Sequence, residues 1–489
     1  MIYKTILLLS LFWLTIPTHA KDYDASFFGI ESNGQTLNTT SIQKAIDFIH
    51  EKGGGRLVFS VGRYVTGSIF MKSNVTIHLK EGAVILGSTN PFDYQRQRWT
   101  ALVFAFDQEN IGITGAGVID GRGYEVAKNM VAFIHKGVIE DPHFKNDRPW
   151  ELLRPNNIYF KNCKNITIRG IHLNNAACWT QQYRLCKNIL IEGITVDSKN
   201  YWNNDGIDIV DSDSVIIRNN YIDASDDGIC LKSRHDTLGC QDVLIYNNTV
   251  RSSASGIKIG TVTRGHFKNI NIINNKVYDT YRSAITLAAV DGSTVEDVVV
   301  DSVTAINVGN VLFLRIGERR KGYKGALKNI TISNVYGEVA ATKADAGYPY
   351  EGPIEHLPRN ISPSSIVGTP TEKIENITLK NIEIHHPGGA DPNYAKVGLD
   401  ELDKIPELTN RYPEFSMFKE LPAWGFYVRH AKNLRFENVK LICKKKDFRM
   451  AIVLDDVNGA EFNNLEVKEV EGKKEPIYSH KCNGITGEN

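Results

Sequence analysis

Short segments of alternating aliphatic and polar residues recur along most of the chain. Clear copies are SNVTIHL at Ser73, KNITIRGIHL at Lys164, DSVIIRNNYI at Asp213, KNITISNVYG at Lys328 and KNLRFENVKL at Lys432. Between Lys164 and Glu296 the copies recur every 23 to 28 residues. Alternation with a period of two predicts β-strands, and two short strands joined by an Asn or Gly corner predict a bent coil. Because one coil cannot bury both of its faces, we expect an all-β fold in which the coils stack into a right-handed parallel β-helix.

The asparagine that recurs in each copy suits a corner, because Asn tolerates left-handed backbone and hydrogen-bonds locally. Some of these residues also form Asn-x-Thr sequons, including Asn74, Asn165, Asn329 and Asn376. Since they occupy equivalent positions in the repeat, we expect a ladder of corner residues rather than glycan acceptors.

The end of a solenoid exposes apolar side chains unless something covers it. Residues 39–53 carry an N-cap candidate in Thr39 or Thr40 and a stop signal in Gly53. Apolar residues between them have helical spacing, namely Ile42, Ala45, Ile46 and Ile49. This segment is therefore predicted to be an N-terminal capping helix.

Longer stretches without the repeat occur at about 114–156, 339–370 and 386–424. The repeat resumes after each stretch, so they are predicted to be loops that leave the coils. Residues 21–489 are accordingly expected to form a single β-helix domain.

The first twenty residues have the pattern of a secretory signal peptide. Lys4 precedes an apolar run from Ile6 to Ile16, and the small residues Thr18 and Ala20 stand where a signal peptidase reads. No cysteine lies near the cut, and no later run is apolar and long enough to cross a bilayer. We expect a mature chain that begins near Lys21 and is secreted or periplasmic.

The charge balance and the cysteines exclude some classes of partner and metal site. The 57 lysines and arginines nearly balance the 56 aspartates and glutamates, which argues against a nucleic-acid binder. Among the seven cysteines, Cys163 and Cys186 fall at equivalent repeat positions, so they could form a disulfide or stack as buried thiols. The cysteine spacings match no zinc pattern, so we expect no metal. We also expect a monomer that needs no cofactor.

A third strand in each coil brings carboxylates together. The strands are GIDI at Gly206, GICL at Gly228, GIKI at Gly256, AITL at Ala284 and VLFL at Val311. If they stack about 4.8 Å apart, Asp205 and Asp227 lie one rung apart with Asp226 beside them. Carboxylates this close cannot all ionise freely, so at least one pKa should rise. Glycosidic hydrolysis needs one protonated acid beside ionised partners. Aspartates that merely close corners, and a calcium site, are the alternatives.

The segments NNDGIDI (203–209) and SDDGICLKS (225–233) resemble glycoside hydrolase family 28, the polygalacturonases and rhamnogalacturonan hydrolases. The segments AITLAAVDG, VLFLRIGERR and LPAWGFYVRHA are similar to a bacterial branch of that family. The resemblance implies an inverting hydrolase of α-linked galacturonate in pectic poly- or oligosaccharides. It implies that Asp226 is the general acid, that Asp205 and Asp227 position the water, and that Asn203 belongs to the substrate-binding motif.

Two family motifs that hold the galacturonate are altered. The Gly-His-Gly motif reads Ala254-Ser255-Gly256, and the Arg-Ile-Lys motif falls near RSAITL at 282–287. Other cations must then pair with the sugar carboxylate. Candidates with outward positions on the third strands or on later rungs are Lys258, Lys232, Arg282 and Arg315. Lys258, one rung from Asp227, is also expected to keep the basic aspartates ionised.

The sequence leaves the exact substrate open. Polygalacturonan, rhamnogalacturonan, another decorated pectin and a chain end all remain possible substrates, as do endo and exo action. Two other functions also compete. A pectate-lyase-like β-helix would use calcium and a base to cleave the chain by β-elimination. A non-catalytic carbohydrate-binding β-helix would have no reason to stack Asp205, Asp226 and Asp227.

Overall fold

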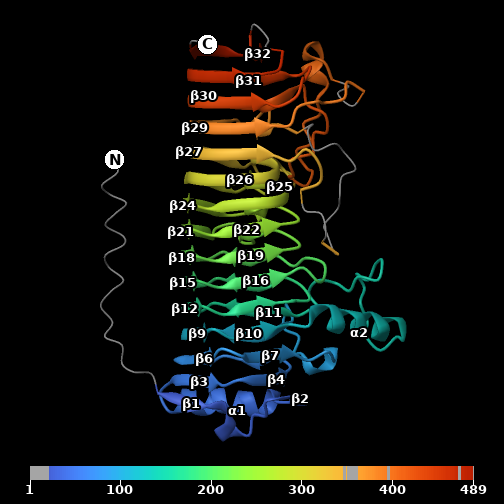
Figure 1. Ribbon diagram of the computed structural model, residues 1–489, viewed down its shortest axis with the longest axis vertical. Coiled ribbons are helices and arrows are strands. Elements are labelled where there is room, and N and C mark those ends of the chain that lie inside the picture. Colours follow the sequence, from blue (N-terminus) through green and yellow to red (C-terminus); the bar gives the residue numbers. More distant parts are fainter. Residues whose placement is uncertain (1–20, 345–347, 350–361, 394–396, 472–474, 488–489) are drawn as a thin grey trace.

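The computed structural model describes residues 21–344, 348–349, 362–393, 397–471 and 475–487, and the predicted signal peptide lies outside them. The strands wind into a tall stack of coils in which the named strands pair in parallel (Figure 1). The expected parallel β-helix is confirmed. No helix within the described ranges is long and apolar enough to span a membrane.

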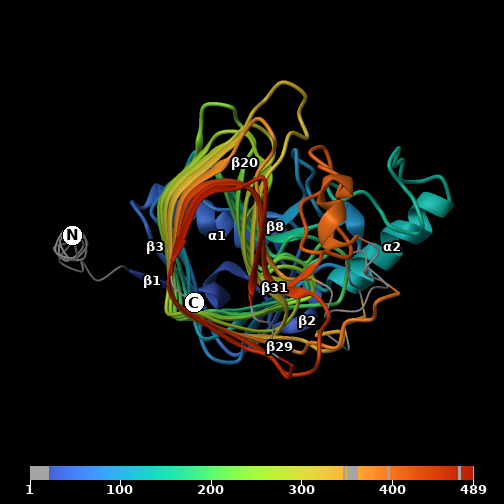
Figure 2. The same ribbon diagram turned by 90° about the horizontal axis from the view of Figure 1, so that it is seen from above.

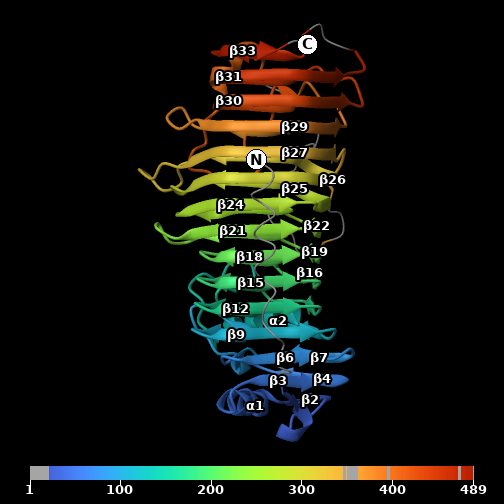
Figure 3. The ribbon, with the colours of Figure 1, turned by 90° about the vertical axis from the view of Figure 1, so that its left-hand side faces the viewer.

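The first sheet contains the strand that follows the Asn corner of each repeat (Figure 3). Its strands are β1 (Asp22–Asp24), β3 (Gly55–Phe59), β6 (Val75–Leu79), β9 (Glu109–Gly115), β12 (Lys164–Arg169), β15 (Lys187–Glu192), β18 (Asp213–Arg218), β21 (Gly239–Tyr246) and β24 (His266–Ile273). Equivalent aliphatics pair from coil to coil, as in the run Ile189, Val215, Val243 and Ile270, and all four are buried. The repeat therefore sets the register that builds the aliphatic interior.

The second sheet carries the strand after the Asn or Gly corner. Its strands are β2 (Asn33–Leu37), β4 (Gly62–Thr66), β7 (Ala83–Gly87), β10 (Val118–Asp120), β13 (His172–Asn174), β16 (Thr195–Ser198), β19 (Tyr221–Ala224) and β22 (Thr249–Ser252).

The third sheet contains the third strand of each coil, including the two strands that follow the predicted catalytic aspartates. It contains β5 (Ile69–Phe70), β8 (Ala101–Phe106), β11 (Asn156–Lys161), β14 (Gln181–Arg184), β17 (Ile207–Val210), β20 (Ile229–Ser233) and β23 (Ile257–Thr263).

Toward the C-terminus, long strands bend from one sheet into the next. They are β25 (Lys276–Ala289), β26 (Thr294–Ile316), β27 (Ala326–Val339), β29 (Ile374–His386), β30 (Ala423–Cys443) and β31 (Met450–Lys468). The short strands β28 (Ser364–Val367), β32 (Ile477–His480) and β33 (Asn483–Gly487) pair with them.

The N-terminal coil is covered by α1 (Thr39–Glu51), as predicted (Figure 1). Its buried face consists of the four apolar residues expected from the spacing. The N-cap prediction was wrong, because Asn38 is the N-cap and both threonines lie inside the helix. The Asn38 side chain accepts from Glu31 N instead of capping, and the Thr39 hydroxyl accepts from Gly67 N at 2.7 Å.

The asparagines form the expected ladder at the corner. Asn74, Asn165, Asn329 and Asn376 all have left-handed φ values between 54° and 65°. Their amides bond along the stack, as in the 2.9 Å contact from Asn376 Nδ2 to Asn329 Oδ1. Each amide thus has a structural partner in the neighbouring coil.

Cys163 and Cys186 are both free, buried thiols, so stacking and not a disulfide is the arrangement present. Burial raises the pKa of Cys186 well above its ordinary value, which keeps that thiol protonated.

The 114–156 stretch and the 397–424 part of the last stretch leave the coils on one side of the stack, although the first also contains the repeat strand β10. The loop prediction for 339–370 was wrong at its end, because Ser364–Val367 forms β28 in the stack, and much of the rest of that stretch lies outside the described residues. The 114–156 stretch contains α2 (Gly123–His135), and the 386–424 stretch contains the 3-10 helix η6 (Leu399–Lys404). Shorter 3-10 turns are η3 (Ala25–Phe28) and η4 (Pro91–Asp93). Figures 1 and 2 show α2 and the 397–424 segment on the same side of the stack. These two excursions supply the walls around the candidate active site.

Candidate active site

Three carboxylates converge at the start of strands in the third sheet. Asp205 lies two residues before β17 and Asp227 two residues before β20, and Gly206 N donates to Asp227 O at 2.9 Å. The registers Ile207–Ile229 and Ile229–Ile257 match the alignment that the sequence predicted. One oxygen from each of Asp205, Asp226 and Asp227 lies within 4.8 Å of the others. The structure therefore brings all three predicted catalytic residues together.

The three carboxylates differ in exposure. Asp205 and Asp227 are each only 3% exposed, whereas Asp226 is partly exposed. Asp227 N donates to Asp226 Oδ1 at 2.9 Å, and Asn203 Nδ2 lies 3.3 Å from Asp226 Oδ2. Asp226 is thus the member of the cluster that is held by hydrogen bonds and is still partly exposed.

Lys232 serves two carboxylates at once. Its Nζ lies 2.8 Å from Asp205 Oδ2, also pairs with Asp208 Oδ1, and sits 3.7 Å from the centre of the Trp179 ring. Burial raises the pKa of Asp205 well above its ordinary value, and it raises the pKa of Asp208 from 3.8 to about 6. One ammonium cannot neutralise two buried carboxylates, so the pair formed by Asp205 and Asp208 tends to retain a proton.

Asp208 was not identified as a site residue from the sequence. The signal was present, because Asp208 and Lys232 both point outward on adjacent rungs, where β17 pairs with β20. Their pairing makes Asp208 a positioning residue that holds Lys232 against Asp205.

Asp208→Asn should stabilise the fold more at neutral pH than at acidic pH. A raised folded pKa means that wild-type stability is lost as pH rises from about 4 to about 6 and stays lost above that. An amide removes this cost because it does not ionise. Its oxygen can still accept a hydrogen bond from Lys232. The variant's advantage should grow by roughly 3 kcal/mol between about pH 4 and pH 7, at 1.36 kcal/mol per pKa unit. Urea unfolding across that range measures it, and a pH-independent difference would contradict the assignment.

Lys258 binds Asp227 from the next rung, in the predicted outward position opposite Cys230. Its Nζ lies 2.7 Å from Asp227 Oδ2 and 2.9 Å from the Tyr412 hydroxyl. Burial opposes ionisation of Asp227, but Lys258, Lys232 and Arg282 outweigh it and hold the pKa of Asp227 below its ordinary value. Lys258 is only 1% exposed, so it is placed to keep Asp227 ionised rather than to meet solvent.

The two predicted arginines have different surroundings. Arg282 Nε lies 3.2 Å from Glu414 Oε2, and its guanidinium carbon lies 5.5 Å from the Tyr412 ring centre. It is close enough to the cluster to help lower the pKa of Asp227. Arg315 instead is buried against Phe418 and donates to Gly368 O at 2.9 Å. The structure places Arg315 as a support for loops and does not bring it into contact with the carboxylates.

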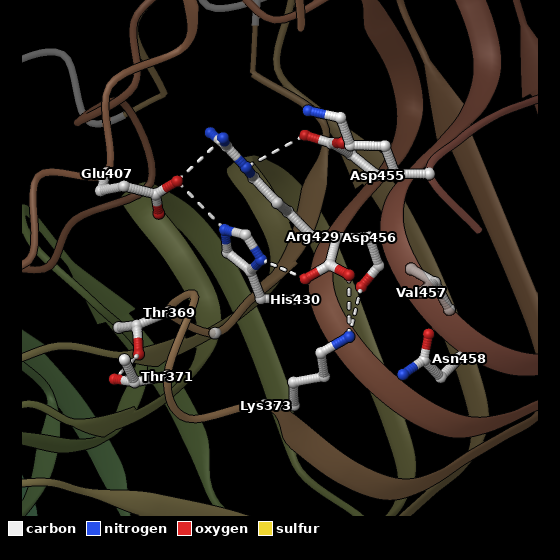
Figure 4. Close-up of polar contacts among 12 residues, drawn as sticks. Thr369, Thr371, Lys373, Glu407, Arg429, His430, Asp455, Asp456, Val457 and Asn458 are labelled. Carbon is white, nitrogen blue, oxygen red and sulfur yellow. Dashed lines mark hydrogen bonds and ion pairs between the residues drawn. The ribbon is translucent and has the colours of Figure 1, made fainter. Parts of the chain in front are cut away.

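Tyr412 and Glu414 were not found from the sequence. Both belong to the 397–424 segment, which is anchored through Glu407 (Figure 4). Glu407 Oε1 lies 2.8 Å from Arg429 Nη2 and 3.0 Å from His430 Nε2. These side chains come from β30 and are held in turn by β31, where His430 Nδ1 lies 2.7 Å from Asp456 Oδ2. The network fixes the loop that covers Lys258 and Arg282.

Asn203 lies at the other edge of the cluster. Its Oδ1 accepts from Arg154 Nη2 at 2.8 Å and also from Arg148 Nη2. Its backbone has a left-handed φ of 58°, a conformation that Asn tolerates. These contacts turn the Asn203 amide toward Asp226.

The sequence profile of "Glycosyl hydrolases family 28" matches residues 59–346. The chain therefore belongs to this family, and it is a glycoside hydrolase.

Known proteins resemble the chain over most of its length. An exo-poly-alpha-D-galacturonosidase from Dickeya chrysanthemi is 22% identical over 429 residues, which cover 73% of this chain and 70% of that protein. A probable polygalacturonase from Vitis vinifera is 25% identical over 395 residues and 73% of each chain. The crystal structure of a hyperthermoactive exopolygalacturonase from Thermotoga maritima has a TM-score of 0.61 at 22% identity, covering 87% of this chain and 92% of that one. This structural likeness shows the shared β-helix fold.

Proposed function

We propose that this enzyme hydrolyses α-linked galacturonate bonds in pectic polysaccharide or its oligosaccharides, with inversion. The observation that carries the proposal is the set of three carboxylate oxygens within 4.8 Å of one another, with an ammonium on each of the two buried aspartates. Relatives named as galacturonosidases and polygalacturonases support the substrate class.

Exposure and charge support the roles that the family motifs imply for the three aspartates. Three carboxylates this close hold at least one proton between them. Asp226 is the partly exposed member, which supports the general-acid role that the family motifs imply, in which it gives a proton to the leaving glycosidic oxygen as the C–O bond breaks. Asp227, kept ionised by Lys258, takes the proton of the water that attacks the anomeric carbon, and Asp205 orients that water.

Inversion rests on the family motifs. The closest carboxylate oxygens lie nearer together than the roughly 6.5–9.5 Å typical of an inverting pair, so the separation alone does not carry this part of the proposal. NMR of the product at early times should show an anomeric configuration opposite to that of the α-linkage. An initial α-product would refute inversion while leaving hydrolysis intact.

Incubation with polygalacturonate, rhamnogalacturonan and their oligosaccharides tests the activity itself. Hydrolysis releases reducing ends and gives no unsaturated product, and a chelator leaves the rate unchanged. A lyase would give an ultraviolet-absorbing unsaturated uronate and would need calcium. The ammonium groups of Lys232 and Lys258 favour hydrolysis, because they hold positive charge where calcium would have to bind. Absence of any product from all four substrates would refute the proposed function.

A further inference from the structure

The cations that were expected to bind substrate are already paired within the protein. Lys232 contacts Asp205 and Asp208, Lys258 contacts Asp227, and Arg282 contacts Glu414. All three cations are at most 6% exposed. A sugar carboxylate that entered the cleft would have to compete with protein carboxylates for each of them.

Positive charge without such partners lies on the other side of Asp226. A pocket with a volume of 420 Å³ opens beside Asn203, between the 143–154 segment and Trp202. Its charged lining residues are Lys145, Arg148, Arg154 and Glu151, with His143 beside them. Three basic side chains thus face a single carboxylate, in a molecule whose total charge is near zero.

Arg154 forms the fixed wall of this pocket. It is buried, and its guanidinium donates to the carbonyl oxygens of Pro149, Ala177 and Trp202 at 2.6 to 2.9 Å. Within the described part of the chain no carboxylate lies within ion-pair distance of Arg148 or Arg154. No carboxylate in that part of the chain therefore neutralises the charge of either arginine.

Arg148 is the partly exposed member of the basic lining. Its guanidinium carbon lies 4.9 Å from the Trp202 ring centre and its Nη2 donates to Asn203 Oδ1. Burial lowers the pKa of Arg148, which shows that its charge is incompletely solvated and would gain from an anionic partner. Asn203 Nδ2 in turn contacts Asp226, so the pocket adjoins the proposed general acid directly.

The aromatic lining fits a sugar ring. Trp150 and Trp202 both face the pocket, and His143 packs on Trp150 with ring centres 4.3 Å apart. The aromatic rings offer a surface for the apolar face of a pyranose, and the neighbouring guanidinium offers a positive charge for the carboxylate of the sugar.

We propose that this pocket is the subsite for a uronate sugar adjacent to the scissile bond, and that Arg148 binds its carboxylate. This rests on the proposed function and names the group that confers specificity for the charged sugar. Arg148 stands on the 114–156 excursion, so the loop and not the β-helix scaffold supplies this charge.

Kinetics on matched acid and methyl-ester oligogalacturonides test the inference. Arg148→Gln should lower kcat/KM on the acid by roughly 10- to 100-fold, the usual cost of losing a charge-assisted hydrogen bond, mainly through a higher KM. On the methyl ester the loss should be less than threefold by this argument, since no charge is there to pair. Arg148→Lys should recover part of the acid activity.

The matched control is Arg169→Gln. Arg169 is an exposed arginine on β12 that pairs with Glu192 at 2.9 Å, and its replacement should leave both rates unchanged. Thermal unfolding of every variant checks that the fold is kept. Equal losses on acid and ester, or an unchanged rate for Arg148→Gln, would overturn the subsite. A wild-type enzyme inactive on both oligosaccharides and on polymeric substrates would instead refute the proposed function on which the subsite depends.

Discussion

Asp226→Asn is expected to reduce the rate of hydrolysis by roughly 10²–10⁴-fold, the typical contribution of a general acid. The amide has nearly the same shape as the carboxyl group and still accepts from Asp227 N, so the fold should be kept. What it lacks is the acidic proton that the leaving oxygen requires. Initial rates on oligogalacturonides, with thermal unfolding measured in parallel, give the result.

The leaving group provides the control for this experiment. An aryl galacturonide releases a phenolate that needs little protonation, so Asp226→Asn should retain much more of its activity on that substrate. Asp205→Asn and Asp227→Asn should lose activity on both substrates, because water activation is needed in each case. If any of the three variants turned over the natural substrate at nearly the wild-type rate, the role assigned to that residue would be wrong.

The parts of the site that the sequence predicted are those on the repeat. Each third strand begins at a comparable position, so aligning GIDI with GICL and GIKI was sufficient to stack Asp205, Asp227 and Lys258. The alternation of side chains along each strand also predicts which of them face outward, and hence which can meet on neighbouring rungs.

The parts that the sequence did not predict lie on the excursions. Tyr412 reaches Lys258 across 154 positions in the chain, and Arg148 reaches Asn203 across 55. No periodicity relates a loop residue to a rung, so local pattern cannot predict such contacts. Arg315 was misassigned for a related reason. Its strand position is outward, but Phe418 of the 397–424 segment packs on its guanidinium, which also donates to Glu407 O of that segment.

Lys258→Met is expected to lower stability by roughly 3–5 kcal/mol, because it leaves Asp227 buried without its cation. The double variant Lys258→Met with Asp227→Asn should recover part of this loss, since no unpaired charge remains. Urea unfolding of the two variants and wild type makes the comparison. Equal stability of wild type and Lys258→Met would show that the ion pair is not formed in solution.

The same substitution should change how activity depends on pH. Lys258 helps to hold the pKa of Asp227 below its ordinary value, so its removal raises that pKa, and the base becomes ionised only at higher pH. The acidic limb of the kcat/KM profile should therefore move to higher pH, with the largest losses under acidic conditions. Because this effect acts through Asp227, it should be the same on acid and methyl-ester substrates, in contrast to the loss expected for Arg148→Gln. A loss confined to the acid substrate, with an unshifted profile, would mean that Lys258 leaves Asp227 and binds the sugar carboxylate itself.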